Sequence, residues 1–288
     1  MKIEEVLIAV FLALILLVVS GVEQCPQGIG GIGGGQTQAA NFGVDFALQP
    51  AIDKITDGKI ITQGSSFLVD ILLENYDSEM KSGQICIRDT IDDTYGGISN
   101  VCRSFSIPGA TYINNQVQAP STLRIAFPEG GYYAYTGLLA DIDANLDVSL
   151  SYAQHSVVSG AVKAPDPETE TIALQQNPSP LKLSAEKSIS SISAENVKAN
   201  LKIGIAKQGN YNITTTDFNK EAIAFSAKLG NYALDCPEVQ QGIVEFKNTK
   251  FISCSAFLPR EQLTHPLIIT LDYGVKLNKE VSFKITKQ

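Results

Sequence analysis

Apolar and polar residues alternate with a period of two along most of the chain beyond residue 43. The segment GSSFLVDILLEN, residues 64–75, puts four apolar side chains on one face: Phe67, Val69, Ile71 and Leu73. Such alternation is typical of strands with one buried face, and no long stretch has the period of an amphipathic helix. Because the segments are separated by Gly, Asn, Asp and Pro, we expect an all-β fold of antiparallel β-sandwiches.

The pattern of expected strands repeats in the two halves of the chain. Each half has a long alternating strand, over residues 67–73 and 199–205, and a later strand that ends in Leu-x-Tyr, at Tyr152 and at Tyr273. After each tyrosine we expect a turn and a last strand; these last strands cover residues 157–162 and 281–285. We therefore predict two copies of one sandwich module, residues 44–164 and 178–288, joined by a Pro/Glu-rich linker, residues 165–177.

The segments GSSFLVDILLEN and SGQICIR, within residues 64–88, resemble the second and third strands of immunoglobulin-like modules in prokaryotic surface proteins. The CARDB-type adhesion modules are the nearest in pattern. In these modules a Gly precedes an alternating strand, an Asn ends it and another Gly begins the next strand. The chain contains no tryptophan, which many immunoglobulin domains bury. The resemblance implies two tandem antiparallel immunoglobulin-like sandwiches in an extracellular setting, and it implies no site residues.

The N-terminal residues 1–22 form either a membrane anchor or a cleaved signal segment. The uncharged stretch from Val6 to Val22 would span roughly 25 Å as a helix, slightly less than the bilayer core of about 30 Å. Residues 19–21, Val-Ser-Gly, would serve as a signal cleavage site. The leading segment has a single lysine offset by two glutamates, which favours a retained anchor. Either interpretation predicts export, with the C-terminal modules outside the cell.

Residues 23–43 are rich in glycine and are interpreted as a flexible tether. Six of the eight residues 28–35 are glycine. A phosphate-binding loop would need a preceding strand, a following helix and a nearby lysine. An apolar segment precedes the glycines instead, and no lysine occurs between Lys2 and Lys54. Glycine loses much conformational entropy when it is ordered, so a spacer is the simpler interpretation.

The chain has five cysteines, of which four form two local pairs. Cys86 pairs with Cys102 and Cys236 with Cys254, so each module has one expected disulfide, as export permits. A zinc site is the rival interpretation, but no C-x-x-C motif occurs and the two histidines have no ligand spacing to the cysteines. The fifth residue, Cys25, is either free or pairs between chains.

The net charge of −8 argues against a nucleic-acid partner, because phosphate binding needs a basic surface. Residues 44–164 contain 14 acidic and 7 basic residues, a net charge of −7. Residues 178–288 contain 10 acidic and 14 basic residues, a net charge of +4. The opposite charges allow self-association, although unrelated changes in two solvated surfaces would also produce the difference.

Two acidic segments are candidates for calcium. In DIDANLD, residues 141–147, the acidic positions alternate with apolar ones, which favours the outer face of a half-buried strand over a calcium loop. In the segment between Cys86 and Cys102, Asp89, Asp92 and Asp93 are weak calcium candidates. The alternative there is a polar turn, and we expect no resident metal.

Two further segments are candidates for recognition or modification. The loop PEGGYYAYTG contains Tyr132, Tyr133 and Tyr135, and aromatic side chains on a glycine-containing loop suit contact with glycans or proteins. The alternative is a strand whose alternate tyrosines pack inward. Asn212 begins the N-x-T sequence of a glycosylation site.

No motif supports catalysis or a cofactor. The two histidines are not near a serine or acid motif, and oxidised cysteines cannot act as thiol nucleophiles. We therefore expect a non-catalytic structural or adhesion protein, bound to the membrane through Val6 to Val22, with surface proteins or glycans as partners. The alternatives are a subunit of a surface filament or envelope assembly, and a secreted carbohydrate-binding or carbohydrate-active accessory protein.

Overall fold

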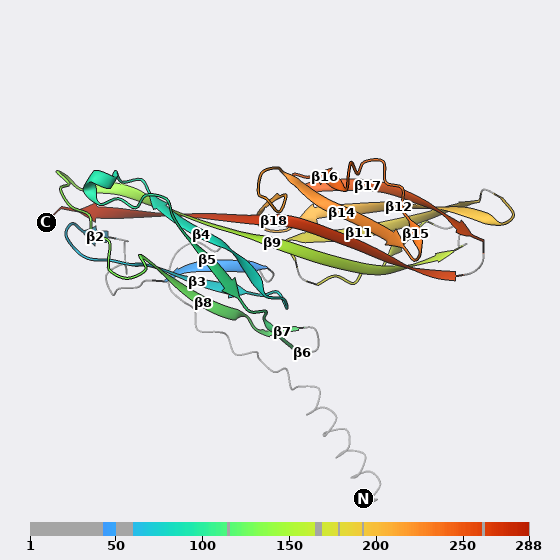
Figure 1. Cartoon of the computed structure of the whole chain (residues 1–288), viewed down its shortest axis with the longest axis horizontal. Helices are drawn as coiled ribbons and strands as arrows, with labels where there is room; N and C mark the ends of the chain where they lie inside the picture. The colour runs from blue at the N-terminus through green and yellow to red at the C-terminus, as the bar shows by residue number, and fades with distance from the viewer. Residues whose placement is uncertain are drawn as a thin grey trace, which may run out of the picture. The chain divides into compact units, whose positions relative to one another are not determined.

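Strands paired almost entirely antiparallel form the regular structure of the chain in the computed structural model (Figure 1). The structure describes residues 43–49, 60–113, 116–164, 169–177, 179–191, 193–260 and 263–287, all within the unit Ala39–Gln288. In these residues the helical element is a single 3-10 turn, η1 (Asp93–Tyr95). The expected all-β, antiparallel class is confirmed, whereas the division into immunoglobulin-like modules stays a prediction.

Four sheets contain the described strands. A three-stranded sheet has the order β1 (Val44–Gln49), β3 (Val69–Asn75), β8 (Ser121–Phe127). A four-stranded sheet has the order β10 (Glu170–Ile172), β11 (Leu181–Ser191), β12 (Asn196–Lys207), β17 (Thr249–Pro259). A small sheet pairs β6 (Thr111–Ile113) with β7 (Gln116–Ala119).

The largest sheet has nine strands. Its path runs β15 (Tyr232–Ala233), β14 (Ala222–Leu229), β18 (Leu263–Thr286), β9 (Ile142–Ala164), β4 (Lys81–Asp89), β5 (Val101–Ile107). Beside this path, β18 also pairs with β13 (Asn212–Thr214) and β2 (Ile60–Thr62), and β14 pairs with β16 (Ile243–Glu245). The β2–β18 pair is parallel.

Strands β9 and β18 are far longer than ordinary strands and lie alongside one another (Figure 1). All 23 residues of β9 pair with β18, from Ile142 opposite Ile285 to Ala164 opposite Leu263. At about 3.3 Å per residue this ladder is roughly 75 Å long. It pairs with β4 towards one end and with β14 towards the other, so residues from both halves of the sequence share one sheet.

The expected turns after Tyr152 and Tyr273 are wrong. Residues 153–156 and 274–280 continue β9 and β18 without interruption. The alternation persists in β9, but its inward positions there are the polar residues Gln154 and Ser156, which are buried. In the sequence, a polar residue at an inward position is easily interpreted as the end of a strand. The residues that pair with it and allow its burial lie in distant parts of the chain.

Alternation elsewhere predicts burial correctly. In the segment ending with β3, the side chains of Phe67, Val69, Ile71 and Leu73 are all buried. In β9 the inward residues Ala144, Leu146 and Val148 are buried, and the intervening acidic positions face outward. Asp147 accepts a hydrogen bond from Arg88 Nε at 2.9 Å. The strand interpretation of residues 141–147 is therefore confirmed.

Both expected disulfides are present, and each has a different structural role. Cys86 and Cys102 are directly opposite one another on the neighbouring strands β4 and β5. Cys236 follows β15 and joins Cys254 on β17, so this disulfide connects the nine-stranded and four-stranded sheets. Closing loops of this size stabilises a fold by about 3 kcal/mol each in the chain-entropy model. Disulfides indicate an extracytoplasmic protein.

The predicted anchor or signal segment, residues 1–22, and the predicted tether, residues 23–43, lie outside the described residues except for Gly43, and so do Val6 to Val22 and Cys25. In the part of the chain that the structure does describe, no helix has the length and apolar character that crossing a membrane requires. Within the predicted linker 165–177, the structure describes residues 169–177. There β10 pairs with β11 in the four-stranded sheet.

Candidate functional site

Two of the three aspartates considered for calcium, Asp89 and Asp92, have their carboxylates in hydrogen bonds, and the third, Asp93, is exposed in η1. Asp89 Oδ1 accepts from the backbone N–H of Ile91 at 2.9 Å, and Asp89 Oδ2 accepts from Tyr135 at 2.6 Å. Asp92 caps η1 and accepts from Thr94 N and Oγ1. These bonds also lower the pKa of Asp92. In the described ranges, no three His, Cys, Asp or Glu side chains gather so that they could hold a metal ion.

The three loop tyrosines face different environments. Tyr132 is 65% exposed. Tyr133 packs against Phe67, with ring centroids 5.8 Å apart, and Tyr135 is fully buried and stacks on Phe67 and Phe283. Tyr135 therefore packs inward, Tyr133 is half-buried, and Tyr132 is the most exposed of the three predicted recognition residues.

Asn212, the candidate glycosylation residue, is exposed at the first position of β13. Thr214, the third residue of the sequon, is buried, and its hydroxyl donates to Thr215 O at 3.0 Å. The asparagine amide is thus accessible in the folded protein, and its modification stays a prediction.

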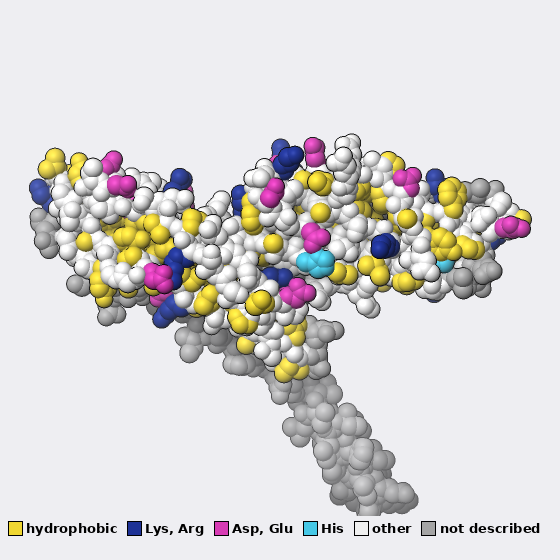
Figure 2. Space-filling view, in the orientation of Figure 1, with side chains coloured by type: hydrophobic (Ala, Val, Ile, Leu, Met, Phe, Trp, Pro, Cys, Tyr) yellow, Lys and Arg dark blue, Asp and Glu magenta, His cyan; other side chains and the backbone are white. Residues whose placement is uncertain are grey.

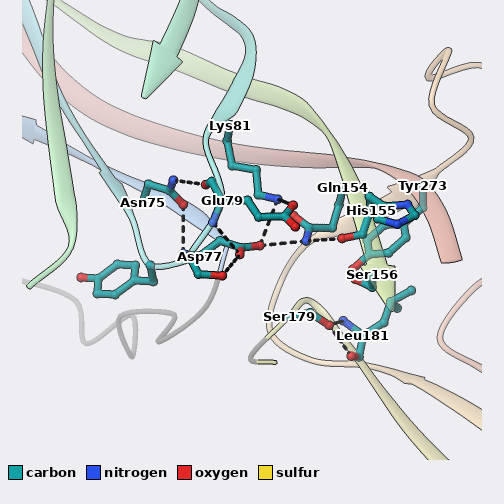
Figure 3. A network of polar contacts seen from close by, with 12 residues as sticks. Asn75, Asp77, Glu79, Lys81, Gln154, His155, Ser156, Ser179, Leu181 and Tyr273 are labelled. Atoms are coloured by element: carbon teal, nitrogen blue, oxygen red, sulfur yellow. Dashed lines mark hydrogen bonds and ion pairs between the residues drawn. The ribbon is translucent and has the colours of Figure 1, made fainter. Parts of the chain in front are cut away.

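A buried polar cluster that the sequence did not reveal lies where β9 passes the β3–β4 turn (Figure 3). We call Asp77, Lys81 and Gln154 the junction cluster. Asp77 Oδ2 lies 3.0 Å from Lys81 Nζ and accepts a hydrogen bond from Gln154 Nε2 at 2.9 Å. Asn75 orders the turn by accepting from Asp77 N at 3.0 Å and donating to Glu79 O at 2.9 Å. A fully buried charge pair with an added amide is a costly arrangement that needs complete pairing.

The next inward position of β9 continues this polar region. Ser156 Oγ lies 3.4 Å from Tyr273 OH, and both residues are buried. Burial is the main cause that raises the pKa of Tyr273, to about 12. One feature of the sequence could have indicated this polar region. The alternation of β9 continues through Gln154 and Ser156, where a turn was predicted.

Alkaline pH is expected to destabilise the protein through Tyr273. The folded state keeps the phenol proton up to a pKa of about 12, whereas the unfolded chain releases it near 10. The contribution of Tyr273 to the free energy of unfolding is therefore complete below pH 10. It is lost as pH rises from 10 to 12, by about 1.4 kcal/mol per pH unit. Thermal unfolding midpoints of the Tyr273→Phe variant should fall less steeply over this range. Tyr132→Phe is the control, and equal slopes for Tyr273→Phe and the unchanged protein would contradict the assignment.

The outer face of the four-stranded sheet carries a shallow groove of about 420 Å³. The register places Ser188, Asn200 and Ser255 in one row across β11, β12 and β17. Along β17, Phe257 and Phe251 stand on either side of these positions, 61% and 56% exposed. Neither ring lines the groove itself, and we call the groove together with these two flanking rings the Phe–Lys groove.

A lysine accompanies each phenylalanine of the groove. Lys198 Nζ lies 5.9 Å from the centroid of Phe257, and Lys202 Nζ lies 4.8 Å from that of Phe251. Charged side chains of both signs are scattered over the face seen in Figure 2, among uncharged surface. The alternation in KFISCSAF predicts that both phenylalanines face outward. The lysines lie next to them because β12 pairs with β17, which the local sequence does not show.

No family model matches the chain, and no curated protein matches it. Among solved structures, the chain is similar to the crystal structure of envelope protein VP37 from White Spot Syndrome Virus. The match covers 42% of this chain and 97% of that chain, with 11% sequence identity and a TM-score of 0.28. A TM-score this low carries no argument about fold or function.

Proposed function

We propose that the protein is a non-catalytic structural or adhesion protein of the cell surface, exported and held at the membrane by Val6 to Val22. The observation that carries the proposal is the uninterrupted ladder between β9 and β18. A hinge between the two halves of the sequence would have to break this ladder and the junction cluster beside it. A long, continuous pair of strands suits a protein that transmits force or holds a surface away from the membrane.

The disulfides add support for an exposed location. Each closes a local loop next to the shared sheet, and each is favoured in an oxidising compartment. Cross-links of this kind limit unfolding of a chain that works outside the cell, where chaperones do not act on it.

Surface labelling tests this proposal. In cells producing the full chain with a C-terminal epitope, we expect a membrane-impermeant reagent to label the epitope, and the protein to pellet with membranes in high salt. A variant lacking residues 6–22 is the control and should be neither exported nor labelled. Protection of the epitope in intact cells would refute the proposal. Detergent-resistant assemblies of high mass would favour a filament or envelope subunit instead.

The Phe–Lys groove supports a second candidate, recognition of carbohydrate. Its hydroxyl and amide groups can exchange hydrogen bonds with sugar hydroxyls, and the two exposed rings offer flat apolar surfaces to sugar rings. This candidate corresponds to the carbohydrate-binding alternative that composition left open, but it places the contact on β17 and not on the tyrosine loop.

Removing both rings is expected to abolish such binding without unfolding the protein. The double variant Phe251→Ala/Phe257→Ala should weaken binding of a glycan by at least about tenfold, and change the free energy of unfolding by about 0.5 kcal/mol or less per site. A glycan array followed by calorimetry measures the first, and thermal unfolding measures the second. Ile268→Ala, at a 43% exposed residue on β18, is the matched control. Unchanged affinity in the double variant would exclude the groove.

A further inference from the structure

The junction cluster brings together a primary amine, a carboxylate and a carboxamide (Figure 3), and the three side chains are almost fully buried. The side chains of Lys81 and Asp77 are 4% and 7% exposed, and Gln154 is 3% exposed. The same oxygen, Asp77 Oδ2, lies 3.0 Å from Lys81 Nζ and 2.9 Å from Gln154 Nε2. The amine and the carboxamide nitrogen are therefore no further apart than the sum of these two distances.

Lys81 and Gln154 lie just beyond the end of the ladder between β4 and β9. Gly83 on β4 pairs with Tyr152 on β9, and extending that register by two residues places Lys81 opposite Gln154. Residues in this relation point to the same face of the two strands. The long lysine side chain can therefore bring its amine to the carboxamide carbon.

The carboxamide is also incompletely hydrogen-bonded. Gln154 Nε2 donates to Asp77 and to the carbonyl oxygen of His155 at 3.1 Å, but Gln154 Oε1 is buried without a partner in the structure. Leaving a buried carbonyl oxygen unpaired costs free energy. A purely structural role for glutamine would leave that cost unexplained.

We propose that Lys81 and Gln154 condense into an isopeptide bond that joins β4 to β9. Asp77 first accepts a proton from the Lys81 ammonium. The free amine then attacks Gln154 Cδ and forms the new C–N bond. Asp77 gives its proton to Nε2, the Cδ–Nε2 bond breaks to release ammonia, and Asp77 carries the second proton from the former lysine nitrogen to that ammonia. One ammonium ion leaves, Asp77 is again a carboxylate, and no oxidant or other reactant is needed.

The neighbouring carboxylates are less suitable as the acceptor of the amine. Lys81 Nζ also lies 3.4 Å from Glu79 Oε2, but that side chain is 62% exposed. The negative charge of a carboxylate opposes attack by an amine, whereas a carboxamide is neutral and carries a nitrogen that can leave as ammonia. Asp77 bridges both reacting groups, which is the position that a proton carrier requires.

This inference does not depend on the proposed function, because the bond would form in any compartment where the chain folds. It adds a third covalent cross-link to the two disulfides, and it lies where β9 passes between the two halves of the sequence. Unlike a disulfide, this bond would survive reduction.

Peptide mapping of the purified full chain tests the proposal. After unfolding, reduction and alkylation, a digest should contain one branched peptide holding both Lys81 and Gln154, lighter than its two parts by one ammonia. Fragmentation should place the branch at these two side chains. Linear, unmodified peptides covering both residues, recovered from folded protein in full yield, would overturn the proposal.

Variants separate the cross-link from a general effect on folding. Lys81→Arg should eliminate the branched peptide, and Asp77→Asn, which keeps both reacting groups, should reduce its yield at least tenfold. Lys187→Arg is the control at another buried lysine, which pairs with Glu170 at 2.9 Å, and it should leave the branched peptide in place. Circular dichroism identifies any variant that fails to fold. A branched peptide of normal yield in Asp77→Asn would refute the role of Asp77.

Discussion

Replacing Val158 with aspartate should unfold the protein or reduce its free energy of unfolding by at least about 4 kcal/mol. Val158 is fully buried on the inward face of β9, opposite Ile269 of β18. The substitution removes about 1.5–3 kcal/mol of apolar burial and adds a buried charge that costs several kcal/mol more. The free energy of unfolding of a typical domain is only about 5–15 kcal/mol in total. Thermal unfolding followed by circular dichroism measures the loss.

The neighbouring residue provides a matched control for this prediction. Val157 is 53% exposed on the opposite face of the same strand, so Val157→Asp should change the stability by roughly 0.5 kcal/mol or less. Because side chains alternate, a shift of β9 by one residue would exchange the two results. Equal effects of the two substitutions would contradict the register.

The same pair of variants tests whether the two halves of the sequence unfold together. Val158 lies beyond the part of β9 that pairs with β4, but the ladder with β18 continues through both regions. Val158→Asp should therefore speed hydrogen exchange in β4 as well as in β14. Normal protection of β4 in this variant, with β14 exchanging fast, would show that the halves are independent.

The second large effect is expected in the junction cluster. Asp77→Leu should reduce the free energy of unfolding by about 3–5 kcal/mol, because it removes the buried charge partner of Lys81 and leaves only the exposed carboxylate of Glu79, at 3.4 Å. The double variant Asp77→Leu/Lys81→Met should recover most of this loss, since an apolar pair of similar volume can replace a buried ion pair at little cost.

Comparing these two variants removes any contribution of the proposed isopeptide bond, because both lack the proton carrier. Their difference in thermal unfolding midpoint therefore reports the buried Lys81 ammonium that has lost Asp77. If the double variant is no more stable than Asp77→Leu, the charge pair is not what holds the turn, and the hydrogen bonds of Asp77 to the turn backbone are the main cause of the loss.

Local pattern was sufficient to predict several parts of the structure. Alternation identified β3 and the outward acidic face of β9, because burial of one face is a property of the strand itself. The short separations within each cysteine pair indicated Cys86–Cys102 and Cys236–Cys254, which are present. The all-β class follows from the same signals.

The candidate sites depended on contacts that local pattern does not encode. Tyr135 and Tyr132 are three residues apart in one loop, yet one is buried against Phe283 of β18 and the other is exposed. The Phe–Lys groove exists because β12 pairs with β17 in one particular register. Neither arrangement could be read from the segments that contribute to it.

The sequence by itself determined the strand class, the two disulfides and the alternating faces, because each depends on residues close together in the chain. Only the tertiary structure decided that β9 and β18 continue past Tyr152 and Tyr273. At those points the inward residues are polar, and they can be buried only because Asp77 and Lys81 from another turn meet Gln154, while Ser156 meets Tyr273. The partners of buried polar groups come from distant segments of the chain. The local pattern therefore indicates a strand end at Tyr152 and Tyr273, although both strands continue there in the folded chain.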